Sequence, residues 1–262
     1  MSGPVPFPAL ATHRHLQLNI KQTMPHARIV SDVRRAFAPM PDTIVFNEAV
    51  AITHDAIRSI AAASGYGVRI DKGPAGQVVL AWRLDKFRAE AHKATLAMPG
   101  RKDVTPTRYV KRTRLRTLDT GRRRMLVGTH MVASGWTGTK HLDAWRQRGW
   151  YGHAAIMTTL LRAVAMNPWN DVVIWSGDCN RPPYAWTGKR PFPRLTNVAG
   201  LATSKIVDTD HTHGGITFDY VGFLSRKAKV RVAHWSTPSF NSDHDGILVD
   251  LEWAEPAPAI RR

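Results

Sequence analysis

Hydrophobic residues recur along the chain with two different spacings, and each spacing predicts one kind of secondary structure. Leu16, Leu18 and Ile20 alternate with polar neighbours, which is the two-residue repeat of a β-strand. Residues 29–37 instead carry apolar side chains four positions apart, as on one face of an α-helix. The same two patterns predict strands at 15–20, 43–46, 77–82, 125–130, 172–175, 216–223, 230–234 and 247–253, and helices at 29–37, 52–63 and 141–166.

The alternation of strands and helices predicts an α/β protein. In the longest helix, Gly149 and Gly152 are two positions where the helix could be interrupted. Neither a repeat nor a linker rich in glycine and serine divides the chain, so we expect one domain over residues 1–262. Its core is expected at about 14–253, between loose ends.

The composition of the chain indicates a folded protein with a negatively charged binding partner. Hydrophobic residues make up 43% of the chain and charged residues 22%, as in folded proteins. The net charge of +17 and the pI of about 10.8 favour a polyanionic partner, with nucleic acid as the first candidate. No apolar run approaches the roughly 20 residues that span a bilayer, so no membrane insertion is expected.

Cys179 is the only cysteine, which limits the disulfides and the metal sites that the chain can form. One cysteine can form no intramolecular disulfide, so any metal must be held by oxygen or histidine nitrogen. Prolines break the first eleven residues, which therefore lack the apolar segment of a secretory signal. We expect a cytoplasmic protein and a monomer.

Polar residues follow the predicted strands at the points where the chain leaves the sheet. Oxygen ligands with histidine are what phosphodiester hydrolysis needs, because a cation neutralises charge, a carboxylate orients water and an imidazole handles protons. Each residue also has a plainer interpretation: a core amide, a charge at a helix N-terminus or an ordinary turn residue. The residues are Asn19, Glu48, His130, Asp178 with Asn180, Asp219, and Asp243 with His244.

The order of these short motifs resembles the endonuclease/exonuclease/phosphatase superfamily. The resemblance rests on Leu18-Asn19, Asn47-Glu48, Thr129-His130, Gly177-Asp178-Cys179-Asn180, Phe218-Asp219-Tyr220 and Ser242-Asp243-His244. It implies a four-layer, deoxyribonuclease-I-like fold, in which a two-sheet β-sandwich is flanked by helices. It also implies a hydrolase that acts on phosphodiester bonds.

The resemblance implies a role for each residue. Glu48 would be the principal ligand of Mg²⁺ or Mn²⁺, with Asn19 and Asp243 close to the metal. Asp178 would orient or deprotonate the attacking water, while Asn180 would hold the nucleophile or a phosphate oxygen. The remaining roles concern histidines: His244 would contact the phosphate and share a proton with Asp219, and His130 would be a second phosphate ligand and general acid.

Three positions depart from the family pattern. Cys179 replaces a bulky apolar residue and is expected to pack in the core, not to act as a nucleophile. Asp245-Gly246 stands where many members have proline, which would loosen the loop. Gly76 and Gln77 occupy the neighbourhood of a carboxylate that some members pair with the histidine at position 130. Separately, His211 and His213 with Asp208 and Asp210 fit a flexible loop better than a second metal site.

Cationic residues predict how nucleic acid would be bound. Residues 101–124 hold ten Lys or Arg against two Asp. If residues 109–118 form a strand, Arg112, Arg114 and Arg116 share one face and meet successive phosphates without reading bases. The alternative is an edge strand whose charges discourage aggregation. A second set, Lys189 and Arg190 with Tyr184 and Trp186, follows the Asp178 turn.

Together these features predict a metal-dependent nuclease that cleaves DNA with little sequence specificity, although RNA fits the same residues. Two alternatives remain open. One is a phosphoesterase of the same fold that acts on a phospholipid or an inositol phosphate. The other is a nucleic-acid-binding protein that keeps the fold without turnover.

Overall fold

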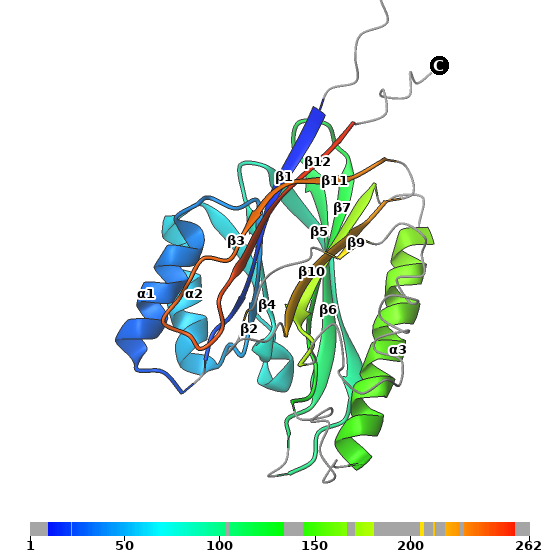
Figure 1. Cartoon of the computed structure of the whole chain (residues 1–262). Helices are drawn as coiled ribbons and strands as arrows, with labels where there is room; N and C mark the ends of the chain where they lie inside the picture. Colours follow the sequence, from blue (N-terminus) through cyan, green and yellow to red (C-terminus); the bar gives the residue numbers. More distant parts are fainter. Residues whose placement is uncertain are drawn as a thin grey trace, which may run out of the picture.

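Two six-stranded sheets form the centre of the protein in this computed structural model (Figure 1). The structure describes residues 10–21, 23–102, 105–133, 144–166, 171–180, 205–206, 212, 218–225 and 228–254. The first sheet has the order β11-β12-β1-β2-β4-β3 and the second has the order β5-β6-β7-β8-β10-β9.

The first sheet joins the two ends of the described chain. Its strands are β1 (Leu10–Asn19), β2 (Thr43–Asn47), β3 (Tyr66–Arg69), β4 (Val79–Arg83), β11 (Arg231–Ser236) and β12 (Ile247–Ala254). Strand β1 pairs antiparallel with β12 along its length, so that Leu10 lies opposite Ala254. It therefore begins earlier than the alternation from residue 15 predicts.

The second sheet contains the longest strands. Its members are β5 (Phe87–Met98), β6 (Arg108–Thr117), β7 (Arg123–His130), β8 (Val172–Asp178), β9 (Lys205–Ile206) and β10 (Asp219–Leu224). Strands β7 and β8 are parallel, whereas β10 pairs antiparallel with β8. These three strands supply half of the predicted site.

Helices cover the outer faces of both sheets, as Figure 1 shows. Helices α1 (His26–Phe37) and α2 (Ala51–Ala63) lie on the first sheet, and α3 (Ala144–Met166) lies on the second. A short 3-10 helix, η1 (Gly73–Gln77), precedes β4. The predicted sandwich flanked by helices is confirmed, and its helices and sheets make four layers.

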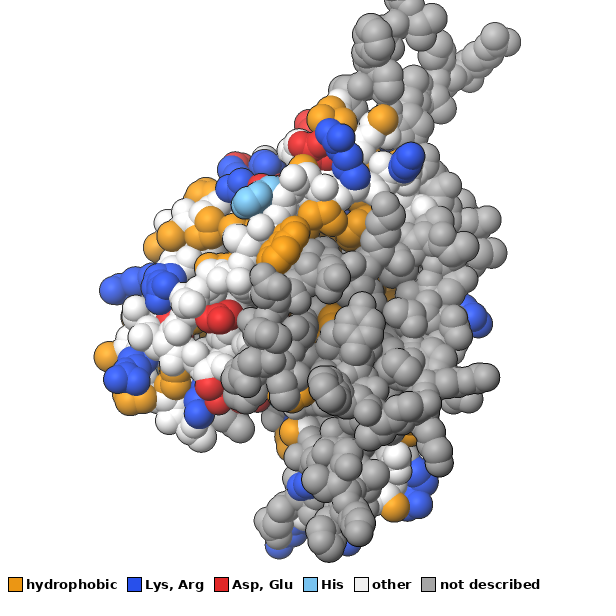
Figure 2. Space-filling model, in the orientation of Figure 1, with side chains coloured by type: hydrophobic (Ala, Val, Ile, Leu, Met, Phe, Trp, Pro, Cys, Tyr) orange, Lys and Arg blue, Asp and Glu red, His pale blue; other side chains and the backbone are white. Residues whose placement is uncertain are grey.

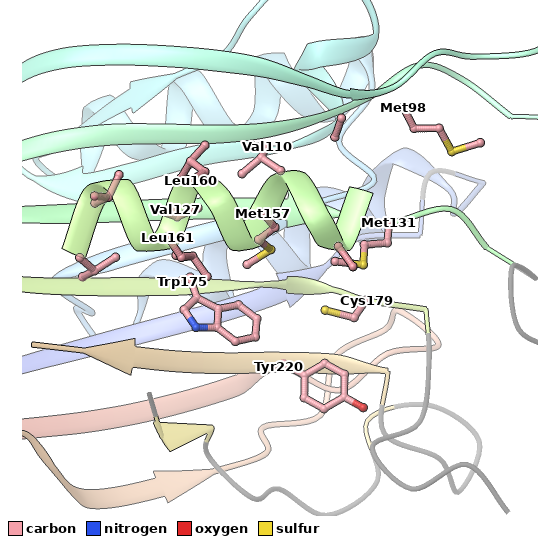
Figure 3. Close-up of a cluster of buried hydrophobic side chains, with 14 of the residues drawn as sticks. Met98, Val110, Val127, Met131, Met157, Leu160, Leu161, Trp175, Cys179 and Tyr220 are labelled. Atoms are coloured by element: carbon pink, nitrogen blue, oxygen red, sulfur yellow. The ribbon is translucent and has the colours of Figure 1, made fainter. Parts of the chain in front are cut away.

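Three hydrophobic layers hold this arrangement together. Apolar side chains of α1 and α2 pack on the first sheet, a second set fills the space between the sheets, and a third lies under α3. Figure 3 shows the third set, where Met157 and Leu161 of α3 meet Trp175 and Cys179. The glycines do not interrupt α3; a Cβ at Gly149 would lie 2.3 Å from the side chain of Met98, so glycine permits this close approach.

Candidate active site

The predicted polar residues come together at one end of the sandwich because the strands that carry them are paired in register. Asn19 and Asn47 are partners in the parallel pair β1–β2, so Glu48 follows directly beside Asn19. His130 and Asp178 are partners in the parallel pair β7–β8. The carboxyl ends of four strands, two from each sheet, thus deliver side chains to one place.

Asp178 lies at the centre of this group and is almost fully buried. Its Oδ2 accepts a hydrogen bond from Asn19 Nδ2 at 2.9 Å, and its Oδ1 accepts one from the backbone N–H of Asn180 at 2.6 Å. Burial raises the pKa of Asp178 well above its ordinary value, and the charge of Asp219 adds to the effect. A carboxylate held this way is suited to take up a proton.

His244 forms an ion pair with Asp219 across the same site. Its Nδ1 lies 2.6 Å from Asp219 Oδ2, while Asp219 Oδ1 accepts a hydrogen bond from Gln17 Nε2 at 2.8 Å. Burial alone would lower the pKa of His244, but the hydrogen bond and charge of Asp219 outweigh it and raise the pKa to about 9. The imidazole therefore carries a positive charge at neutral pH.

Glu48 and Asn19 offer oxygen atoms that fit a hard divalent cation. Burial raises the pKa of Glu48, and its backbone adopts a left-handed conformation (φ 55°) that non-glycine residues rarely adopt. Asn19 Oδ1 is buried without a hydrogen-bond partner among the described residues. Such an oxygen beside a carboxylate is what Mg²⁺ or Mn²⁺ prefers as a ligand. The two residues therefore fit the expected metal.

Among the described residues, two groups of side chains have the geometry to hold a cation. The first consists of Glu48, His130 and Asp178, and the second of Asp178, Asp219 and His244; in each, one ligand atom per residue lies within 4.8 Å of the others. Asp243 belongs to neither group. Its Oδ2 lies 3.0 Å from Lys21 Nζ at the exposed edge of the site.

His130 is oriented by Arg108, which the sequence interpretation did not assign to the site. Arg108 Nη1 donates to His130 Nδ1 at 2.7 Å and to Gln77 Oε1 at 2.6 Å. Because a guanidinium only donates, Nδ1 must accept, and the neutral ring carries its hydrogen on Nε2. His130 Nε2 lies 3.6 Å from Asp178 Oδ2 and 3.9 Å from Glu48 Oε1. Burial, followed by the charge of Arg108, lowers the pKa of His130 well below its ordinary value.

The turn after β8 explains two of the predicted positions. Gly177 has φ 151°, and a Cβ there would lie 1.8 Å from the carbonyl oxygen of Thr129, so only glycine fits. Asn180 donates Nδ2 to the carbonyl oxygen of Met131 at 3.1 Å, and its backbone N–H reaches Asp178. Cys179 is fully buried under α3, as the prediction of core packing requires.

Helix α1 holds the loop that carries His244. Asp32 is fully buried and accepts hydrogen bonds from Asn241 N, Asn241 Nδ2 and Ser242 N at 2.9, 2.7 and 3.0 Å. Gly246 N donates to the carbonyl oxygen of Pro238, and a Cβ at Gly246 would lie 2.6 Å from the ring of Phe240. The expectation of a loose loop at Asp245-Gly246 is therefore wrong.

The predicted nucleic-acid contacts lie elsewhere. Arg112, Arg114 and Arg116 do share one face of β6, but the strand runs away from the site after Arg108. Strand β6 lies between β5 and β7, so the alternative of an edge strand is wrong. Lys189 and Arg190 lie outside the described residues, as do Tyr184, Trp186 and the group Asp208, Asp210, His211 and His213.

Comparisons with known proteins identify the fold. No protein-family profile matches the chain, and no curated protein matches it. Among solved structures, an endonuclease/exonuclease/phosphatase from Bacteroides vulgatus matches with a TM-score of 0.70 at 16% identity, covering 93% of this chain and 99% of that one.

Two other solved structures match as well. D. rerio TDP2 complexed with a single-strand DNA product gives a TM-score of 0.69 at 15% identity, covering 92% and 99% of the two chains. A mannosyl-6-phosphatase from Bacteroides thetaiotaomicron gives 0.69 at 12% identity, covering 91% and 99%. The chain therefore has the deoxyribonuclease-I-like fold of the endonuclease/exonuclease/phosphatase proteins. None of the helices in the described ranges is long and apolar enough to cross a membrane.

Proposed function

We propose that this chain, which has the deoxyribonuclease-I-like fold, is a divalent-metal-dependent phosphodiesterase whose substrate is nucleic acid, DNA foremost. The observation that carries the proposal is that a buried carboxyl group and a positively charged imidazole lie together at one end of the sandwich. A buried carboxylate with a raised pKa, Asp178, stands beside the Asp219–His244 ion pair. Groups whose pKa values are moved apart in this way are typical of acid–base pairs in hydrolases.

Glu48 and Asn19 are the residues that would hold the metal. Both follow or end strands of the first sheet, and Asn19 Oδ1 has no other partner among the described side chains. Asp243 forms an ion pair with Lys21 at the edge of the site, so we propose that it lies near the metal without being its principal ligand. A bound Mg²⁺ or Mn²⁺ supplies charge stabilisation to the phosphate oxygens, worth several kcal/mol.

Asp178 is proposed to orient the attacking water and accept its proton. Asn19 Nδ2 and the N–H of Asn180 hold the two carboxylate oxygens in fixed positions. The side-chain amide of Asn180 is itself held by the Met131 carbonyl, so we assign this residue a positioning role beside the nucleophile. Fixed geometry of this kind lowers the entropic part of the barrier.

The two histidines are proposed to bind the phosphate differently. His244 is charged at neutral pH and would stabilise the negative charge that develops on the phosphate oxygens. His130 is neutral and carries its hydrogen on Nε2, so it would donate one hydrogen bond. A neutral ring with a lowered pKa fits a donor better than the general acid that the family resemblance implies.

Nucleic acid is the substrate class that the charge of the chain supports. The net charge of +17 attracts a polyanion far more strongly than a small phosphate ester of low charge. A structural neighbour, D. rerio TDP2, holds a single-strand DNA product. Another neighbour is a sugar phosphatase, so the fold alone does not fix the substrate.

A substrate panel tests this assignment. Initial rates would be measured with Mg²⁺ on supercoiled plasmid, single-stranded DNA, RNA and p-nitrophenyl phosphate, each with an EDTA control. We expect cleavage of the nucleic acids that EDTA abolishes, with DNA preferred and little turnover of the monoester. Metal-dependent turnover of the monoester alone would contradict the proposal and favour a phosphatase.

A further inference from the structure

Six cationic side chains gather on the outer side of three neighbouring strands, away from the catalytic end. Residues 112, 114 and 116 alternate along β6 and therefore point to one face. The register adds Lys93 opposite Arg112 and Arg88 opposite Arg116 on β5, and Arg123 opposite Arg116 on β7. We call this set the arginine face; its members are Arg88, Lys93, Arg112, Arg114, Arg116 and Arg123.

One carboxylate, that of Glu90, forms ion pairs with three of the six cations of this face. Glu90, at a register shift in β5, lies 3.1 Å from Arg114 Nε, 4.0 Å from Arg116 Nη1 and 2.8 Å from Arg123 Nε. The seven side chains together carry a net charge of +5. Like charges directly opposite each other on a sheet are destabilising, so this face contains a repulsion that a bound polyanion would relieve.

The arginine face is open to solvent. The side chain of Arg116 is 52% exposed, and those of Arg114 and Arg123 are 32% and 30% exposed. Helix α3 borders the face: it packs on Val110 of β6 and on Met125 of β7, and Met125 lies directly opposite Arg114. In the view of Figure 2, the Lys and Arg side chains stand as separate groups, over the α1 and α2 layer and at the other edges of the molecule.

The face is too far from the catalytic end to touch the scissile phosphate. Arg108, which contacts His130, marks that end of β6. At about 3.3 Å per residue, Arg112 lies roughly 13 Å farther along the strand and Arg116 roughly 26 Å. Any substrate that reaches both places must therefore be a chain of many phosphates.

We infer that the arginine face is a remote binding site for the sugar–phosphate backbone of nucleic acid, separate from the catalytic site. Its cations neutralise phosphates without contacting bases, which gives binding without sequence specificity. Tethering at this face would raise the local concentration of substrate at the catalytic end. Only that last consequence rests on the proposed function; binding itself does not require hydrolysis.

The test removes charge without disturbing Glu90. Arg88→Gln/Lys93→Gln/Arg112→Gln changes the three members that lie outside the Glu90 ion pairs. A matched control, Arg28→Gln/Arg34→Gln/Lys229→Gln, removes three exposed charges from other surfaces. Binding of a 30-nucleotide single-stranded DNA would be followed by fluorescence anisotropy in EDTA at several salt concentrations, after thermal melting has shown that each variant is folded.

We expect only the arginine-face variant to lose affinity for DNA. Arg88→Gln/Lys93→Gln/Arg112→Gln should bind the single-stranded DNA at least tenfold more weakly than the wild type at about 0.1 M salt. The slope of the logarithm of its binding constant against the logarithm of the salt concentration should fall in magnitude by about 2, the equivalent of three phosphate contacts. The control should stay within twofold, and Arg88→Lys/Arg112→Lys, which keeps the charge, should bind as the wild type does.

Two results would overturn the inference. One is a face variant that binds DNA as the control variant does. The other is a wild-type protein that ignores DNA but sediments with vesicles of phosphatidylserine and phosphatidylcholine through the same residues. Because the assay contains no metal, a protein that hydrolyses nothing can still pass it, so failure of the proposed function remains distinguishable.

Discussion

At the scale of single residues, the candidate active site depends on side chains whose partners fix their protonation. Asp219 holds a proton on His244, while Arg108 leaves His130 neutral with its hydrogen on Nε2. The sequence predicted His130 and Asp219 because each follows or opens an apolar run. It could not predict Arg108, because that residue is one of many cations in its segment, and only the pairing of β6 with β7 brings it to His130.

Substitution of Arg108 tests this orientation. In Arg108→Met the donor to Nδ1 is lost, so we expect His130 to populate the Nδ1–H tautomer and phosphodiester cleavage to fall by about 10- to 100-fold. Nitrogen-15 chemical shifts of the His130 ring report the tautomer directly. Arg108→Lys should restore part of the activity, whereas an unchanged ring spectrum in Arg108→Met would disprove the assignment.

At the scale of elements, the site depends on how strands pair and on how one helix holds one loop. Periodicity predicted eleven of the elements near their observed bounds, and the conditional strand at 109–118 is β6, but it missed β3, β5, β9 and η1. Strand β3 has four residues, and β5 is an exposed edge strand whose alternation is broken at Glu90. The pairing order, which brings Asp219 opposite Asp178, follows from long-range contacts that no local pattern records.

The hydrogen bonds of Asp32 to the His244 loop carry a prediction at this scale. In Asp32→Ala three donors of Asn241 and Ser242 lose their acceptor. Leaving donors unsatisfied costs about 1–3 kcal/mol each where burial keeps water away, so we expect the free energy of unfolding to fall by at least about 2 kcal/mol. Urea denaturation measures this, and a loss below about 0.5 kcal/mol would show that α1 does not hold the loop.

At the scale of the whole molecule, the interface between the two sheets contains buried histidines as well as apolar side chains. His15 Nδ1 bonds Thr43 Oγ1 in the first sheet, and its Nε2 bonds Ser176 Oγ in the second, each at 2.8 Å. Burial lowers the pKa of His15 from 6.5 to about 3. The folded protein therefore keeps this ring neutral at pH values where the unfolded chain protonates it.

Acid should weaken the sandwich for that reason. Between about pH 6.5 and pH 3 the unfolded state binds a proton that the folded state does not, so stability falls as pH falls, by up to about 1.4 kcal/mol per pH unit for this histidine. His15→Gln should show a shallower loss of unfolding free energy from pH 6 to pH 4 than the wild type. His26→Gln, at an exposed position, should keep the wild-type slope.

The difference between slopes is the quantity to compare in that experiment, because the raised pKa of Asp178 acts in the opposite direction in every variant. Equal slopes for His15→Gln and the wild type would refute the assignment of a neutral buried His15.

The net charge of the chain is also a property of the whole molecule. It predicted a polyanionic partner, but only the sheet register shows that six of the cations share one face.

The most direct test of the central claim compares two buried carboxylates, Asp178 at the end of β8 and Asp42 just before β2. Asp178→Asn removes the proposed base, whereas Asp42→Asn changes an equally buried carboxylate that contacts Arg14 and Lys86 instead. Nicking of supercoiled plasmid would be timed in Mg²⁺, with EDTA controls and a thermal melt for each variant.

We predict Mg²⁺-dependent nicking by the wild type, a loss of at least about 10²-fold in Asp178→Asn, and activity within about threefold of the wild type in Asp42→Asn. Folded Asp178→Asn protein that nicks plasmid at the wild-type rate would contradict the proposed catalytic site. Folded wild-type protein that cleaves no phosphodiester in Mg²⁺ or Mn²⁺ would contradict the proposed function itself.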